Sequence, residues 1–487
     1  MVKKQKSITK NVIMNIILTM SSFIFPLITF PYISRILSPT GTGKVSFATA
    51  FISYFNMFAQ LGIPTYGIRA CAKVRDDKDE LSKVANELLI INFFMGMISY
   101  LILFFVINNV QRFQQDKNLY LIISLTLFFN IIGMEWLYKA LEQYTYITTR
   151  SIIFKIIAIL AMFCIIHKES DYILYGGISI FAASASNILN FFNVQKYISK
   201  KNIKDLNISR HFKPIFIFFA MSCATTIYTN LDTIMLGFIT TDTEVGYYNA
   251  AIKIKIILVN IVTALGAVLL PRSSYYIEHN MMTEFKKVNT KAFNSIFLLS
   301  IPLLTYFILF AQPCIYFISG SAYTKSIVPM RIIMPTLLII GISYQIGIQV
   351  LVPMGLEKIV LCSEITGAFT DMILNFTLIP LFGASGAAFG TLVAEVVVLL
   401  IQLSFLKNKS FDFFKGIRID KLLIATTMGI FLSIWIIFLK INSFTQLLLS
   451  SVIFFGIYGI FLILAKEPAM LEIWKQISQV YNHSKKI

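Results

Sequence analysis

Long apolar runs separated by short polar breaks limit the folds that this sequence can adopt more than any other feature does. Most runs are near 20 residues, and a helix of that length rises about 30 Å, the thickness of a bilayer's hydrocarbon core. Because hydrocarbon offers backbone amides no hydrogen-bond partners, each run has to be helical. The sequence therefore predicts an all-α, polytopic membrane protein of about 14 transmembrane helices. The expected spans are residues 12–33, 45–64, 87–107, 118–138, 151–166, 172–194, 214–238, 247–271, 292–313, 327–350, 359–382, 384–406, 422–439 and 445–465.

The composition agrees with lipid as the main solvent. Of the 487 residues, 57% are hydrophobic and 14% are charged, whereas soluble domains are nearer half apolar and a quarter charged. A water-soluble fold would lack the polar surface needed to cover itself. The basic N-terminus precedes an apolar stretch at 12–33 that is too long for the core of a signal peptide, so we expect a retained first helix.

Positive charge is distributed as membrane topology requires. The chain has 42 Lys and Arg against 24 Asp and Glu, a net charge of +18. In nucleic-acid-binding proteins basic residues gather on a folded soluble face, but here they occupy the breaks between apolar runs. With the N-terminus inside, inward segments carry 31 Lys and Arg and outward loops carry 7. The positive-inside rule predicts cytoplasmic termini at both ends, and we expect no nucleic-acid partner.

The sequence has no pattern of catalytic or metal-binding residues. The five cysteines have no paired spacing and the four histidines form no cluster, so we expect no disulfide, no metal site and no cofactor. The longest inward loops have about 20 residues, too few for a soluble catalytic domain. We therefore expect a transporter and not an enzyme.

Two pairs of segments resemble each other across the chain. PYISRILSPTGTGKVSFATAF and LDTIMLGFITTDTEVGYYNAA contain the ends of spans one and seven with their exits, and they place Gly43 and Gly246 in equivalent positions 203 residues apart. KALEQYTYITTRS and PMGLEKIVLCSEI enter spans five and eleven, and they place Glu142 and Glu357 215 residues apart. Both copies enter from the same side of the membrane, which indicates a parallel repeat; chance similarity of short patterns is the alternative.

A parallel repeat predicts two six-helix lobes related by an axis along the membrane normal. The two copies would account for twelve of the spans. The expected parts are an N-terminal lobe at 1–200, a C-terminal lobe at 210–406, and two additional transmembrane helices with a cytoplasmic tail at 407–487.

Three motifs, each at the place in the predicted topology where the family has it, carry a family resemblance. NLDTIMLGFITTDTEVGYYNAAIKI (230–254), LEQYTYITTRS (141–151) and LFGASGAAFGTLVAE (381–395) resemble the polysaccharide-transport branch of the multidrug/oligosaccharidyl-lipid/polysaccharide flippase superfamily. The resemblance covers roughly the whole chain, including the number of helices. It implies a two-lobed flippase of the bacterial cell membrane that carries the repeat units of O-antigen or capsule.

The resemblance also implies a substrate and an energy source. The substrate would be an undecaprenyl-pyrophosphate-linked oligosaccharide, moved from the cytoplasmic to the outer leaflet by alternating access. A gradient of H⁺ or Na⁺ would drive the movement, and the flippase itself would hydrolyse no ATP. A polysaccharide polymerase would be a partner in the same membrane.

The charged head of such a lipid cannot cross hydrocarbon unaided, because burying a charged group costs many kcal/mol. Ionisable residues inside spans are therefore the first candidates for a wet, cationic cavity. Asp232 and Lys253 lie at matched depth on consecutive spans. They form either a structural ion pair or a switch in which substrate phosphate competes with Asp232 for Lys253. Lys255 lies about 200° further around the helix, so the two lysines cannot both face one narrow cavity.

Asp371 and Glu395 form a second matched pair, near mid-bilayer on neighbouring spans. Two carboxylates placed close together there would not both ionise, and one could hold a proton. With Asp232 they are the predicted coupling groups for H⁺ or Na⁺. The alternative is that Asp371 and Glu395 are neutral acids that hydrogen-bond to different neighbours.

Arginines at span ends are further candidates for phosphate, which a guanidinium can bind through two parallel hydrogen bonds. Topology or anchoring to lipid headgroups would also place arginines at span ends, and Arg150 is another arginine in such a position. Lys155, one turn inside the fifth span, is expected to extend to the cytoplasmic surface. The arginines predicted to bind substrate are Arg35, Arg69, Arg272 and Arg331.

Two other functions fit parts of the pattern. A multidrug or cation antiporter of the same superfamily would need an acidic cavity, whereas the in-span lysines favour an anion. A membrane-embedded polysaccharide polymerase or ligase, an enzyme, would be expected to carry a large external loop with catalytic residues. The largest outward loop here has about 15 residues. The sequence favours the flippase.

Overall fold

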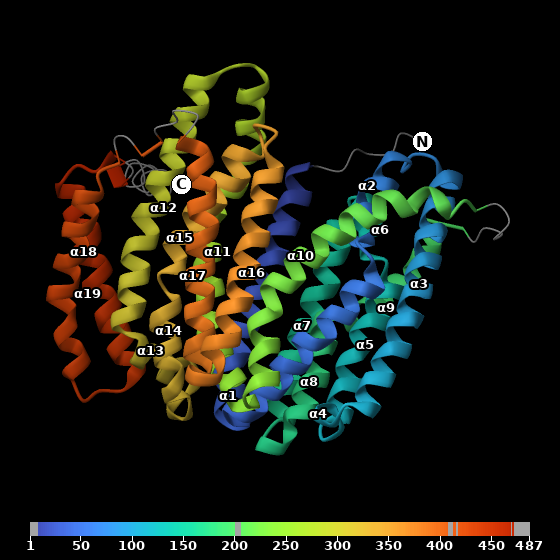
Figure 1. The fold of residues 1–487 in the computed structure, drawn as a ribbon, viewed down its shortest axis with the longest axis horizontal. Helices are drawn as coiled ribbons and strands as arrows, with labels where there is room; N and C mark the ends of the chain where they lie inside the picture. Colours follow the sequence, from blue (N-terminus) through green and yellow to red (C-terminus); the bar gives the residue numbers. More distant parts are fainter. Residues whose placement is uncertain (1–7, 200–205, 408–412, 415–416, 469, 472–487) are drawn as a thin grey trace, which may run out of the picture. The chain divides into compact units, whose positions relative to one another are not determined.

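The computed structural model (Figure 1) describes residues 8–199, 206–407, 413–414, 417–468 and 470–471. Every regular element within these residues is a helix, which confirms the prediction of an all-α membrane protein. Two compact units make up the chain, Met1–Gly246 (unit 1) and Tyr247–Ile487 (unit 2).

The described helices of unit 1 are long and short α-helices, with short 3₁₀ or π-helical turns only after α7. They are α1 (Ile8–Gln60), α2 (Ile63–Lys73), α3 (Lys78–Asn109), α4 (Gln111–Gln114), α5 (Lys117–Gly133), α6 (Glu135–Ala140), α7 (Tyr144–Ile165), η1 (Glu169–Asp171), α8 (Tyr172–Ile180), η2 (Phe181–Ala185), α9 (Asn187–Asn193), η3 (Val194–Lys196) and α10 (Ser209–Ile239).

Helix α11 (Asp242–Glu278) begins at the end of unit 1 and continues into unit 2. The other described helices of unit 2 are α12 (Met282–Leu309), α13 (Ala311–Ser319), η5 (Ser321–Ser326), α14 (Ile327–Ile333), α15 (Thr336–Tyr344), η6 (Gln345–Leu351), α16 (Glu357–Phe382), α17 (Ala384–Lys407), α18 (Ile419–Ser433), η7 (Ile434–Phe438) and α19 (Ser443–Leu464).

Eleven helices among the described residues are long and apolar enough to cross a membrane, and one bent pair would make twelve. The predicted number of 14 is not confirmed. Two differences account for most of the gap. Helix α1 combines the expected spans 12–33 and 45–64 in one element, and α5, in place of the expected span 118–138, has only 17 residues.

Helix α1 bends where its two expected spans join. Ser38 has φ 59° and ψ 175°, outside the helical region, while the segments on either side are helical. Ser38 precedes Pro39, and the proline ring disfavours the α conformation in the residue before it. The polar turn predicted between spans one and two is therefore a bend within a nearly continuous helix.

The helix breaks in the other expected spans come from backbone geometry. Helix α5 ends at Gly133 because Met134 adopts the left-handed conformation, with φ 42°. The expected span 172–194 contains the π-helical turn η2 between α8 and α9. The expected span 327–350 is bent by 44° between Ile333 and Thr336. Such breaks follow tertiary packing and not hydropathy.

The boundary between the compact units lies at Gly246, beyond the expected lobe boundary near residues 200–210. Helix α10 contacts α1 and α2 and is therefore part of unit 1. The expected parts 1–200, 210–406 and 407–487 describe a sequence repeat, and they remain a prediction.

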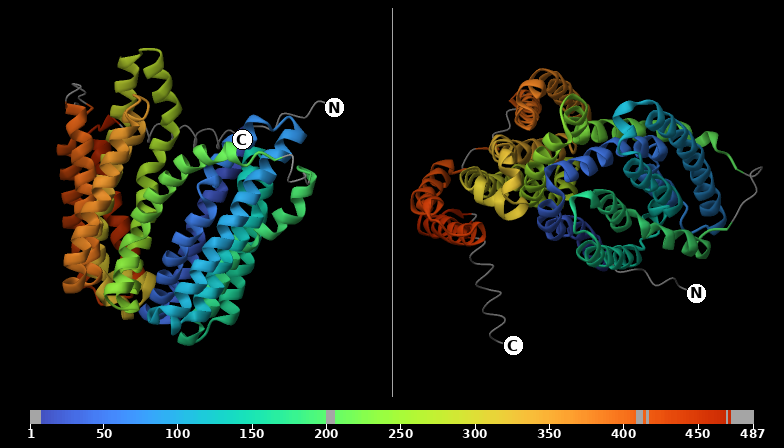
Figure 2. Two further views of the ribbon diagram at one scale, coloured as in Figure 1. Left: turned by 45° about the vertical axis from the view of Figure 1, so that its right-hand side comes forward. Right: turned by 90° about the horizontal axis from the view of Figure 1, so that it is seen from below.

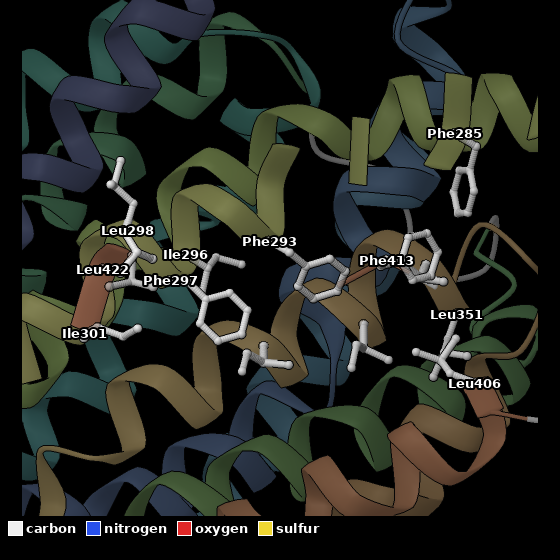
Figure 3. Close-up of a cluster of buried hydrophobic side chains, with 14 of the residues drawn as sticks. Phe285, Phe293, Ile296, Phe297, Leu298, Ile301, Leu351, Leu406, Phe413 and Leu422 are labelled. Atoms are coloured by element: carbon white, nitrogen blue, oxygen red, sulfur yellow. The ribbon is translucent and has the colours of Figure 1, made fainter. Parts of the chain in front are cut away.

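Unit 2 has an apolar core to which α12, η6, α17 and α18 contribute buried side chains (Figure 3). Phe285 and Phe293 on α12, Leu351 on η6 and Leu406 on α17 are buried side chains of this cluster. Helices α18 and α19 form a hairpin at the edge of unit 2 (Figures 1 and 2) that contacts α12 and α13. The hairpin adds Leu422 of α18 to the same core.

Candidate functional site

Unit 2 has a buried polar cluster between α16 and α17. Asp371 and Asn375 on α16 are 3% and 0% exposed, and they lie one turn apart on the same side of the helix. Gly390 on α17 faces them, because a Cβ atom there would be 2.7 Å from Asn375 Oδ1 and 3.0 Å from Asp371 Oδ1. A glycine at this position leaves room for both oxygens beside the α17 backbone.

Thr391, which follows Gly390 on α17, pairs with Tyr248 on α11. Thr391 Oγ1 donates to the Ala387 carbonyl at 3.1 Å and lies 3.1 Å from the Tyr248 hydroxyl. We call Asp371, Asn375, Thr391 and Tyr248 the α16–α17 polar cluster. It combines a carboxyl group, a carboxamide and two hydroxyls, which are oxygen groups that can bind a proton or a hard cation such as Na⁺.

Glu395 is also buried, at 6% exposed, but it is not level with Asp371. Gly390 faces Asp371, whereas Gly367, one turn before Asp371, faces Ala394, whose carbonyl would lie 3.4 Å from a Cβ at Gly367. In this antiparallel hairpin Glu395 is therefore offset from Asp371 by about one turn. The expectation of equal depth is corrected accordingly.

The predicted charge pair on spans seven and eight is divided between the units. Asp232, 8% exposed, lies on α10 in unit 1. Lys253 and Lys255 lie on α11 in unit 2, and both are half-buried. Two residues apart, they point to different sides of α11, as predicted from helix geometry. The pairing of Asp232 with Lys253 stays a prediction.

The arginines predicted to bind substrate lie on four different helices, and all are exposed. They are Arg35 on α1, Arg69 on α2, Arg272 on α11 and Arg331 on α14. Arg35 donates to the carbonyl of Pro31. Arg331 Nε donates to the carbonyl of Ile308 at 3.3 Å. Exposure fits both substrate contact and headgroup anchoring, so their roles stay predictions.

A row of polar side chains crosses the interior of unit 1. Arg150 on α7 is 4% exposed and donates to Asn187 Oδ1 at 2.9 Å and to Glu135 Oε2 at 3.2 Å. Asn187 donates to Asn130 at 3.3 Å, and Asn130 donates to Asn56 at 3.1 Å. Sequence reasoning located the arginine at a span end but not its asparagine partners, since neutral polar residues give no distinct signal in an apolar run.

Lys155, five residues further along α7, bonds to the neighbouring helix. Its Nζ donates to Ser21 Oγ at 2.8 Å and to Ser22 Oγ at 3.0 Å, both on α1. The lysine is therefore held against α1, and the expectation that it extends to the cytoplasmic surface is corrected. Helix α1 supplies two hydroxyls at the one place where α7 presents an ammonium group.

A second polar group in unit 1 surrounds the bend of α1. Lys44 Nζ lies 2.9 Å from Asp116 Oδ2, and the Tyr172 hydroxyl donates to Asp116 Oδ1 at 2.6 Å. The Asp116 side chain is 5% exposed, so its charge depends on these two donors. Arg112 forms an ion pair with Asp242 nearby. We call these five residues the α1-bend network.

Arg112 also holds the end of α10. Burial by itself lowers the pKa of Arg112, but the hydrogen bond and the charge of Asp242 outweigh it and hold the pKa above its ordinary value. The guanidinium therefore stays cationic. Its Nε donates to the Gly237 carbonyl at 3.2 Å, and its centre lies 4.9 Å from the centroid of the Phe47 ring, a cation–π distance.

The two segments predicted to be repeats touch each other in unit 1. Thr40 Oγ1 and Thr243 Oγ1 are 2.8 Å apart, and the two threonines are separated by the repeat spacing of 203 residues. A contact between two equivalent residues is what a twofold axis produces where it passes between copies.

Near this contact, a glycine of each segment packs against the backbone of the other segment. A Cβ at Gly43 would lie 1.7 Å from the Asp242 carbonyl oxygen, and a Cβ at Gly246 would lie 2.0 Å from the Pro39 carbonyl oxygen. Pro39 and Asp242 are again equivalent positions of the predicted repeat. Each copy thus places its glycine on the backbone of the other, and this local symmetry supports the predicted repeat at this place.

Comparison with known sequences gives a family and two similar transporters. Residues 8–277 match the model of the polysaccharide biosynthesis protein family. A protein of Escherichia coli (strain K12) named "Putative O-antigen transporter" is 26% identical over 404 residues, which cover 82% of this chain and 97% of that protein. A protein of Shigella dysenteriae with the same name is 24% identical over 406 residues, covering 82% of this chain and 100% of that protein.

Two solved structures share the fold. The lipid II flippase MurJ in an inward closed conformation matches with a TM-score of 0.72 and 18% identity, covering 94% of this chain and 99% of that one. An inward-facing multidrug resistance MATE family transporter matches with a TM-score of 0.62 and 14% identity, covering 82% of this chain and 99% of that one. At these identities the similarity concerns the fold alone.

Proposed function

Because the chain belongs to the polysaccharide biosynthesis protein family, we propose that it is a flippase for undecaprenyl-pyrophosphate-linked oligosaccharide. It would move the repeat units of a surface polysaccharide from the cytoplasmic to the outer leaflet of the bacterial cytoplasmic membrane. Both termini would lie in the cytoplasm, and a polysaccharide polymerase would use the product. The observation that carries this proposal is the similarity to the protein named "Putative O-antigen transporter" over 97% of that protein's length.

The substrate's pyrophosphate would bind to cationic side chains on the membrane helices. Lys253 and Lys255 are half-buried on α11, and a buried cation in hydrocarbon is costly unless an anion compensates it. One of them would face the pyrophosphate, with the predicted arginines at the helix ends guiding the headgroup in. These positive groups favour an anionic lipid over the cationic drugs that an antiporter of the same fold would carry.

Ion coupling would reside in the α16–α17 polar cluster. Asp371 is 3% exposed, and its carboxylate would need a proton or a cation to be neutral within the membrane. Asn375 supplies a further oxygen on the same side of Gly390, and the site would bind H⁺ or Na⁺. Glu395, one turn away, and Asp232 are the other carboxylates that we assign to coupling.

A reconstituted transport assay tests the proposal. The full chain is placed in proteoliposomes with fluorescent undecaprenyl-pyrophosphate oligosaccharide, and movement of the label between leaflets is followed by its accessibility to a quencher. We expect movement to be at least ten times faster than in protein-free vesicles and to respond to an imposed H⁺ or Na⁺ gradient. Vesicles with the protein that flip no faster than empty ones would exclude the flippase.

Variants of two kinds distinguish ion coupling by Asp371 from substrate binding by the lysines of α11. Asp371→Asn should abolish the response to the ion gradient, and Lys253→Ala or Lys255→Ala should slow movement at every gradient. Thr366→Val, on the exposed side of α16, is the matched control and should behave as the unmodified protein. A response to the gradient that survives in Asp371→Asn would remove the coupling role while leaving the flippase proposal intact.

A further inference from the structure

The π-helical turn of unit 2 carries two glutamines that are fully buried. Gln345 and Gln349 on η6 are both 0% exposed. Four residues apart, they project from nearly the same side of the turn. Turns of this type occur mostly as single insertions in α-helices and often mark functional places. Here η6 lies against α12, α16 and α17.

Polar side chains of α12 and α17 contact η6, and a serine of α16 is hydrogen-bonded to the one from α17. Asn289 on α12 accepts a hydrogen bond from Gln345 Nε2 at 2.9 Å. Gln402 on α17, 2% exposed, donates through Nε2 to Ser363 Oγ on α16 at 3.2 Å. The same Nε2 atom would lie 3.2 Å from a Cβ at Gly347, so Gln402 packs directly on the turn. The η6 amide cluster consists of Asn289, Gln345, Gln349, Ser363 and Gln402.

Hydrogen bonding within the η6 amide cluster is incomplete. Among the described residues, Gln345 Oε1, Gln402 Oε1 and both Oε1 and Nε2 of Gln349 have no hydrogen-bond partner. The neighbouring Ile346 and Val350 belong to the apolar core of unit 2, which also includes Leu351 at the end of η6 (Figure 3). Buried amide groups are nearly always paired, because leaving them unpaired costs free energy.

We propose that the η6 amide cluster is a binding site for buried water. The unpaired atoms are three acceptors and one NH₂ donor, and one water molecule can donate to two of the acceptors and accept from the NH₂ group. A bare cation would bind only the oxygens and would leave the Gln349 NH₂ group without a partner. Buried waters typically make about three hydrogen bonds to such groups. The water would hold η6 in place between α12 and α17, whether or not the chain is a flippase.

The sign of a stability change tests this assignment. In Gln349→Met the side chain keeps its length but loses both hydrogen-bonding atoms. A water that bridges these atoms would lose its anchor, and we expect the thermal unfolding midpoint of the full chain in detergent to fall by several degrees. Ile346→Met, at the neighbouring apolar position of η6, is the control for packing and should change the midpoint less. If the site is dry, Gln349→Met removes an unpaired buried amide and the midpoint rises, which would overturn the proposal.

A second test is to observe the water directly. In a cryo-electron microscopy map of the full chain in nanodiscs, at a resolution that shows water, we expect density about 3 Å from Gln349 Oε1 and Nε2. A Gln349 amide bonded to protein atoms alone would contradict the proposal. A third measurement compares the unfolding midpoint in NaCl and in choline chloride. If NaCl raises the midpoint of the unmodified chain and of Asp371→Asn but not of Gln349→Met, the site binds a cation and the water assignment is wrong.

Discussion

Gly43 illustrates how strongly one residue can be fixed by a backbone contact. A Cβ at this position would lie 1.7 Å from the Asp242 carbonyl oxygen, far inside the closest approach of two non-bonded atoms. We predict that Gly43→Ala destabilises the protein by about 1–3 kcal/mol or prevents its accumulation, because the two backbones have to separate. Thermal unfolding in detergent and the yield of folded protein measure the effect.

Gly246 and Gly456 give this prediction its controls. Gly246→Ala should be as harmful as Gly43→Ala, because its Cβ would meet the Pro39 carbonyl oxygen at 2.0 Å. Gly456 on α19 has no atom within 4 Å of an added Cβ, so Gly456→Ala should be neutral or slightly stabilising. Equal stability of all three variants would show that the repeat segments do not pack as closely as described.

For single residues, the sequence indicated which ionisable side chains are buried better than it indicated which neutral ones are. Asp371 and Glu395 were found because a carboxyl group inside an apolar run is rare and costly. Asn375 was missed, since neutral polar residues are common in membrane helices and only packing decides which of them lie beside a carboxyl group. The one-turn offset of Glu395 was missed for a related reason, because depth was counted from an assumed turn.

At the scale of elements, the α1-bend network joins the bend of α1 to the segments around Asp116 and Tyr172. Asp116 is 5% exposed and Lys44 is 24% exposed, so the pair is partly buried. We predict that Lys44→Met destabilises the protein by about 1–3 kcal/mol, because it leaves a buried carboxylate with one donor fewer. The thermal unfolding midpoint should fall accordingly.

A double variant distinguishes an ion pair from simple packing. Adding Asp116→Asn to Lys44→Met removes the uncompensated charge and should recover a large part of the lost stability. The exposed pair Arg418–Asp420, in which both side chains are more than half exposed, is the comparison, and Arg418→Met should change stability little. Additive losses in the Lys44 and Asp116 variants would contradict the ion-pair account.

The existence of the helices was predictable, but their breaks were only partly so. Ser38 before Pro39 is a local signal for the bend in α1, and the sequence placed a turn there. The π-helical turns η2 and η6 and the left-handed Met134 have no comparable signal. They depend on the side chains packed around them, which hydropathy does not record.

For the whole molecule, the distribution of Lys and Arg predicts which loops face the cytoplasm. Thr241, between α10 and α11, and Asn280, between α11 and α12, are both exposed. In a variant whose five cysteines are replaced by alanine, we predict that Thr241→Cys reacts with a membrane-impermeant maleimide in intact cells. Asn280→Cys should react only after the cells are opened.

The comparison of the two positions contains its own control, because both variants are labelled equally in opened cells if both are exposed. Labelling of Asn280→Cys in intact cells would reverse the predicted orientation. Labelling of both in intact cells would show that the α11 segment does not cross the membrane. The fold itself, which the sequence placed in the correct class, would stand in either case.

The central claim is that this chain moves a lipid-linked oligosaccharide, and deletion in the native host tests it most directly. The measurement is chemical identification of undecaprenyl-linked glycans, with their distribution between the leaflets, in cells with and without the gene. We predict that the deletion strain accumulates undecaprenyl-pyrophosphate-linked repeat units on the inner leaflet and loses a surface polysaccharide, and that the full chain restores both. A deletion strain with unchanged surface polysaccharide and no trapped glycan would contradict the account.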